Sequence, residues 1–118
     1  MRQISVFVPL LLAAPLLAQT PIGLWQTIDD ATKKPKAQVR LTEQAGVVQG
    51  VIVLGLDPND KPDAVCELCS DERKGKPLIG MTILREVRRE TAGESWGGGD
   101  ILDPNNGKIY RVRLTPSA

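Results

Sequence analysis

Short runs of alternating apolar and polar residues recur along the chain, and each run ends in turn-forming residues. In residues 37–43, AQVRLTE, Val39 and Leu41 fall on one face while Arg40 and Thr42 fall on the other. A period of two is typical of a half-buried strand, and no run keeps the period of a helix. Runs of the same kind cover residues 22–28, 47–56, 78–87, 94–103 and 108–115. We therefore expect an all-β antiparallel meander, closed as a barrel or packed as a sandwich.

Two places in this pattern predict local detail. In residues 47–56 the alternation puts four apolar side chains on one face, namely Val48, Ile52, Leu54 and Leu56. Gly50 and Gly55 within the same run suggest a bulge, a bend or the close approach of another strand. Between the last two runs, Asn106-Gly107 predicts a tight hairpin turn, because both residue types tolerate a positive φ.

The N-terminus has the layout of a secretory signal peptide. In residues 1–18, MRQISVFVPLLLAAPLLA, a single cation at Arg2 precedes an apolar stretch, and a small residue stands at Ala18. The apolar stretch is shorter than the roughly 20 residues that span a bilayer as a helix, so we expect no stable membrane span after cleavage. We expect cleavage near Ala18, one β domain over residues 19–118, and a place in the periplasm or outside the cell.

Charge and residue usage exclude several classes of function. Removing Arg2 with the signal peptide leaves fourteen Lys and Arg against fourteen Asp and Glu, so the mature chain is neutral and we expect no nucleic-acid partner. The chain has no histidine, which removes the commonest general base and metal ligand. The pairs Asp29/Asp30 and Asp57/Asp60 lie in polar turns and are interpreted as capping groups. We expect no enzyme activity, no cofactor and no metal.

Cys66 and Cys69 are the two cysteines, and three interpretations stay open for them. In an exported protein a structural disulfide is favoured. A thiol–disulfide exchange role is disfavoured, because Asp63, Glu67 and neighbouring acids would raise the thiol pKa. A metal site would need ligands from a second chain, since one chain offers only this pair and carboxylates.

Two longer blocks resemble one family. DERKGKPLIG (71–80) and GGDILDPNNGKIY (98–110), together with GLWQTIDD near the start of the mature chain, are similar to the bacterial family called domain of unknown function 2147. The resemblance implies an antiparallel lipocalin-like (calycin-like) meander barrel in the periplasm or outside the cell, and no established catalytic activity. Family members usually add a further hairpin after the strand matching KIYRVRL, whereas this chain ends at TPSA. We therefore expect an open or incomplete barrel with exposed edge strands.

Four side chains are candidates for lining a ligand pocket or plugging the barrel: Trp25, Arg73, Trp96 and Tyr110. Plugging is favoured for Trp25, because the chain has so few aromatic residues. Arg73 is a planar donor that can tie its loop to carboxylates or to strand-end carbonyls. The residues after Trp96, Gly97 to Gly99, allow a bulge or the close approach of a backbone or ligand.

Three functions are consistent with these features. The first is non-catalytic binding of a small apolar ligand inside the barrel. The second is a periplasmic thiol–disulfide protein that uses Cys66 and Cys69. The third is an interaction module that forms a homodimer or binds an envelope protein through an open sheet edge.

Overall fold

The computed structural model describes residues 2–3, 20–91 and 94–116. The expected signal peptide, residues 1–18, lies outside the described residues apart from Arg2 and Gln3, so that expectation stays a prediction. The strands are β1 (Arg2–Gln3), β2 (Gly23–Ile28), β3 (Pro35–Gln44), β4 (Val47–Gly55), β5 (Thr82–Arg89), β6 (Trp96–Asp103) and β7 (Lys108–Leu114).

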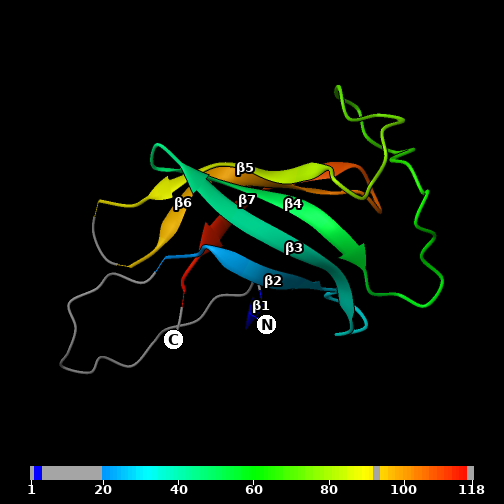
Figure 1. Cartoon of the computed structure of the whole chain (residues 1–118), viewed down its shortest axis with the longest axis horizontal. Coiled ribbons are helices and arrows are strands. Elements are labelled where there is room, and N and C mark those ends of the chain that lie inside the picture. Colours follow the sequence, from blue (N-terminus) through cyan, green and yellow to red (C-terminus); the bar gives the residue numbers. More distant parts are fainter. Residues whose placement is uncertain (1, 4–19, 92–93, 117–118) are drawn as a thin grey trace.

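Each strand from β2 to β7 pairs antiparallel with the next one along the chain, and β1 adds a two-residue parallel pairing to β2. Figure 1 shows the sheet curled over itself, with β3, β4 and β5 on one side and β2 on the other. No pairing joins β2 to β7 in the part of the chain that the structure describes, so the sheet forms an open half-barrel. The expected all-β antiparallel meander, in its open form, is confirmed.

The core lies on the concave face of the half-barrel. Val39 and Leu41 of β3 are fully buried while Arg40 and Thr42 are exposed, as the period of two predicted. The other buried apolar side chains come from every strand between β2 and β7, and include Trp25, Val48, Ile52, Leu84, Val87, Trp96, Leu102, Val112 and Leu114. Burial of these side chains is the main force that holds the sheet in its curved form.

A bulge in β4 corrects one prediction about its faces. Gln38 of β3 pairs with Leu54, but the next residue, Val39, pairs with Ile52, so Val53 is an extra residue on β4. An inserted residue reverses the alternation beyond it. Ile52 is therefore buried, whereas Leu54 is half exposed and does not share its face.

A second bulge explains the glycines after Trp96. The register between β6 and β7 shifts between Trp96 and Gly99, and Gly98 has a φ of 79°. A Cβ on Gly99 would collide with the carbonyl oxygen of Arg85 on the neighbouring strand β5. Both a bulge and a close backbone approach are thus present.

The β6–β7 turn is longer than the predicted tight turn. Asp103 pairs with Lys108 across a four-residue loop, and the amide of Gly107 donates to the carbonyl of Asp103 at 2.8 Å. Gly107 has a φ of 75°, whereas Asn106 does not have a positive φ. The predicted hairpin is therefore present, and only one of its two turn residues adopts a positive φ, because the longer loop needs only one left-handed residue to close.

Candidate functional site

A cavity of about 1100 Å³ opens at one end of the half-barrel. We call this end the mouth, and its border consists of residues 29–34, 57–62 and 103–105. The turns that form the border lie on the right of Figure 1. The inner wall is apolar and is formed by Ala37, Ile52, Leu78, Ile83, Ile101 and Leu102. A concave, largely apolar surface with polar groups at its border is the usual form of a small-molecule site.

The wall is a direct result of strand alternation. Ala37 lies on the same inward face of β3 as Val39 and Leu41, and Ile52 is the last inward residue of β4 before the bulge. The same apolar stripe that forms the core therefore continues as the wall of the cavity.

Ionisable side chains are concentrated around the mouth. Five aspartates line the cavity, Asp29, Asp30, Asp57, Asp60 and Asp103, together with three lysines, Lys34, Lys36 and Lys61. These residues come from three turns that are far apart in the sequence and are brought together by the curvature of the sheet (Figure 1).

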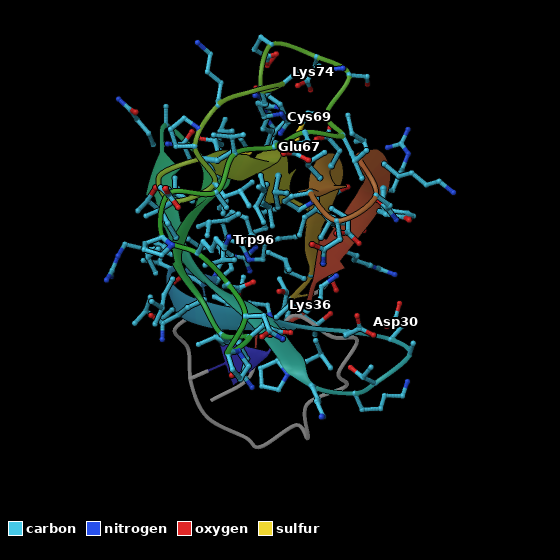
Figure 2. The ribbon with its side chains drawn as sticks, turned by 90° about the vertical axis from the view of Figure 1, so that its right-hand side faces the viewer. Asp30, Lys36, Glu67, Cys69, Lys74 and Trp96 are labelled. Atoms are coloured by element: carbon cyan, nitrogen blue, oxygen red, sulfur yellow. A yellow bond between two sulfur atoms is a disulfide. The ribbon has the colours of Figure 1, made fainter. Side chains whose placement is uncertain are left out.

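One ion pair joins two strands that are not neighbours. Nζ of Lys36, near the start of β3, lies 3.2 Å from Oδ2 of Asp103, at the end of β6. Figure 2 looks at the half-barrel from the mouth and shows Lys36 between the β2–β3 hairpin and the β6–β7 hairpin. Both side chains are about one quarter exposed, so the pair ties the two sides of the mouth together at the edge of the solvent.

Backbone amides hold several of the mouth carboxylates in fixed orientations. Oδ1 of Asp29 accepts from the amides of Ala31 and Thr32 at 2.8 and 2.9 Å, and these bonds, that of Thr32 most strongly, lower the pKa of Asp29. Oδ1 of Asp57 and Oδ1 of Asp103 accept in the same way from the amides two residues further on. These are the turn-capping roles expected of aspartates in such turns.

The aromatic candidates occupy two different places. Trp25 and Trp96 are buried in the core and do not line the cavity. Nε1 of Trp25 donates to the carbonyl of Pro21 at 2.7 Å, whereas Nε1 of Trp96 has no hydrogen-bond partner among the described residues. Tyr110 of β7 does line the cavity, with 46% of its surface exposed. The structure thus separates the two tryptophans from the tyrosine.

Cys66 and Cys69 form a disulfide in the segment between β4 and β5, and both are 1% exposed. The amide of Cys66 donates to the carbonyl of Lys76, and the amide of Gly75 donates to the carbonyl of Cys66. These bonds fold residues 64–78 into a small hairpin-like loop whose sulfur atoms contribute to the core. Figure 2 shows Cys69 at the base of this loop and Lys74 at its tip.

Arg73 fastens that loop to the sheet. Its guanidinium donates from Nε and Nη2 to the carboxylate of Asp71, with Nη2 2.6 Å from Oδ2, and from Nη1 to the carbonyl of Thr82 at 3.0 Å. The Arg73 guanidinium lowers the pKa of Asp71 to about 2. Arg73 is 95% buried and lies away from the cavity, so its contacts hold the loop against the start of β5.

Two classes of site are not found in the part of the chain that the structure describes. Residues 20–91 and 94–116 contain no group of three or more cysteine or acidic side chains placed to hold a metal ion. Nor does that part contain a helix with the length and hydropathy needed to cross a bilayer.

The sequence alone did not indicate that Lys36 and Asp103 would both line the cavity. The sequence offers no reason to connect Asp103 with a lysine 67 positions earlier. Their proximity depends on how strongly the sheet curls, which residue alternation does not specify. No signal in a single sequence would have found this pair.

The comparison with protein families gives one match. A family model described as "Uncharacterized protein conserved in bacteria (DUF2147)" matches residues 23–118, from the start of β2 onward. Searches of curated proteins and of solved structures returned no match. The family match includes the whole mouth of the half-barrel, both resemblance blocks and the disulfide loop. The chain therefore belongs to the DUF2147 family.

Proposed function

We propose that the protein is an exported, non-catalytic binding protein that takes a small, mainly apolar molecule into the cavity at the mouth. The observation that carries the proposal is the cavity of about 1100 Å³ with its wall of Ile, Leu and Ala side chains. Pockets that enclose small ligands typically have volumes of roughly 300–1000 Å³, so this cavity is large enough for a molecule with a long alkyl chain. The likeness to lipocalins, which also bind apolar molecules in a barrel, is part of the proposal.

The layout of the leader and the disulfide support action in the periplasm or outside the cell. Residues 1–18 have the layout of a signal peptide, and a disulfide persists in the periplasm or outside the cell. Both compartments are aqueous, so an apolar molecule would need a soluble carrier to cross them.

The test uses a neutral fluorescent probe and two matched variants. The chain is expressed from its full reading frame and purified from the periplasm, and its mass shows whether cleavage follows Ala18. N-phenyl-1-naphthylamine should gain fluorescence on binding. Ala37→Trp fills the cavity from β3 and should abolish most of the gain, whereas Thr42→Trp lies on the exposed face of the same strand and should leave it unchanged.

Circular dichroism and the melting temperature show whether each variant is folded. A wild-type protein that does not bind the probe, or a folded Ala37→Trp variant that binds it as well as the wild type, would contradict the proposal.

A second candidate function is supported by a different observation. Strand β7 pairs with β6 along one edge, and no strand among the described residues pairs with its other edge. Side chains on both faces of its first half are exposed, Ile109 by 47% and Tyr110 by 46%. Such an edge can accept a strand from a second copy or from an envelope protein. Thiol–disulfide exchange is disfavoured by comparison, because both sulfur-bearing residues are buried and an attacking thiolate needs access.

A further inference from the structure

We infer that the ligand of the cavity is a cationic amphiphile, with an apolar body and an ammonium or similar cationic group at one end. This inference rests on the proposed function and adds the charge of the ligand's polar end. It concerns the whole cavity: the wall selects the apolar body, and the mouth selects the head group.

The charge at the mouth differs from that of the chain. The full sequence carries fifteen Lys and Arg and fourteen Asp and Glu, a net charge of +1. The described residues that line the cavity include five aspartates and three lysines, which gives a net charge of −2 there. Negative charge is thus gathered where a ligand would enter, and the low-dielectric wall behind it strengthens the attraction for a cation.

The anionic groups are held in place before any ligand arrives. Asp29, Asp57 and Asp103 are each fixed by at least one backbone amide, and the second oxygen of Asp60 accepts from the amide of Asp57 at 3.0 Å. Carboxylates that are already oriented pay little conformational entropy when they bind a cation.

The lysines of the mouth compete poorly for an anionic head group. Lys36 is engaged with Asp103. Lys34 and Lys61 are exposed, form no ion pair among the described residues, and can extend their ammonium groups into water. A carboxylate ligand would therefore have to displace Asp103 from Lys36 or immobilise a flexible side chain.

Tyr110 adds a surface that favours a cation. It lines the same cavity from β7, and its hydroxyl accepts from Nδ2 of Asn106 at 2.9 Å, which limits rotation of the ring. An aromatic face attracts an alkylammonium group, and the attraction is roughly 0.5–1 kcal/mol at an exposed site. The same face makes no comparable contact with a carboxylate.

The experiment compares three ligands with the same alkyl chain, dodecyltrimethylammonium, dodecanol and dodecanoate, each below its micelle concentration. Each competes with N-phenyl-1-naphthylamine on the purified protein. At about 20 mM salt we expect the cation to displace the probe at a concentration about five to ten times lower than the carboxylate does. At about 500 mM salt the difference should shrink towards equality, because screening weakens the charge contacts but not the apolar ones.

Two variants identify the charges responsible. Asp30→Asn removes a mouth carboxylate that accepts no hydrogen bond from the described residues, and should reduce the preference for the cation about two- to threefold. Asp63→Asn makes the same charge change at an exposed residue of the β4–β5 segment outside the cavity, and should leave the preference unchanged.

The outcomes separate the inference from the proposed function. If the probe binds but dodecanoate competes as well as the cation, or better, the inference is wrong and the proposed function stands. Equal effects of Asp30→Asn and Asp63→Asn would also overturn it, because the preference would then reflect overall charge. If neither the probe nor any of the three compounds binds, the proposed function fails and the inference fails with it.

Discussion

At the scale of single residues, Arg73 and Asp71 decide whether the disulfide loop stays on the sheet. Arg73 is a buried cation, and each of its three guanidinium nitrogens donates to an acceptor, either the Asp71 carboxylate or the carbonyl of Thr82. Removing the partner of a buried charged group lowers the stability of the fold, because it leaves a buried charge with no opposite charge beside it. The loop's position therefore depends on one carboxylate more than on the charges around it.

Asp71→Asn should lower the free energy of unfolding by about 1–2 kcal/mol at pH 7, since Asp71 is partly exposed and solvent screens its pairing. In the wild type the pKa of Asp71 falls from 3.8 unfolded to about 2 folded. Its contribution is thus complete above about pH 4 and is lost as the pH falls towards 2. Urea unfolding at several pH values measures this.

The control for this change is Glu67→Gln, an exposed acid of the same loop that forms no ion pair within the described part of the chain. It should leave stability and its acid dependence unchanged. If the two variants lose stability equally, or the Asp71→Asn variant keeps the acid dependence of the wild type, Arg73 does not hold the loop in this way.

At the scale of elements, β5 and β6 approach each other more closely than ordinary strands with side chains could. The reason is Gly99, whose α-hydrogen faces the backbone of Arg85 and Glu86. Glu86 itself has a φ of 58°, a conformation that costs a non-glycine residue roughly 1 kcal/mol. The close approach therefore accommodates an irregular stretch of β5.

Gly99→Ala should destabilise the protein by more than about 2 kcal/mol, because its Cβ meets backbone atoms that cannot move without breaking the pairing of β5 with β6. Gly97→Ala, two residues earlier on the same strand, meets the flexible end of Glu90 at 3.2 Å and should cost less than about 1 kcal/mol. Thermal and urea unfolding of the pair measure the difference. Similar losses in both variants would argue against a backbone clash at Gly99.

At the scale of the whole molecule, the open half-barrel exposes β7. Ile109 and the loop residue Leu68 are both exposed, and the adjacent Gly107 packs against Leu68. An uncovered strand with exposed apolar side chains tends to pair with another chain. Self-association through β7 is the simplest way to cover this edge.

We expect the protein to dimerise at high concentration, and Ile109→Lys to shift it to monomer, since a lysine on an edge strand opposes pairing. Leu54→Lys is the control, because Leu54 has a similar exposure on β4, which is not an edge strand. Sedimentation velocity over a range of concentrations provides the measurement. A wild-type protein that stays monomeric, or an equal effect of the two lysines, would rule out association through β7.

The sequence predicted the strands well and the site poorly, for a physical reason. Alternation such as that of Val39 and Leu41 is local, so it identified every strand from β2 to β7. Gly50 and Gly55 indicated an irregularity within residues 47–56, but its position at Val53 was not predictable, because a run of apolar residues looks the same with or without an inserted residue. The Lys36–Asp103 pair depends on sheet curvature, a property of all the strands together.

The order of the strands also has a consequence for how the chain folds. From β2 to β7, every ladder joins strands that are consecutive in the sequence, and most of the connections are short turns. Most pairings then close only a small loop, so the entropy lost at those steps is small and folding can proceed hairpin by hairpin. The 26-residue connection between β4 and β5, residues 56–81, is the longest loop to close. The disulfide loop lies within this connection. Early formation of that loop would reduce the length of flexible chain that must close when β5 pairs with β4.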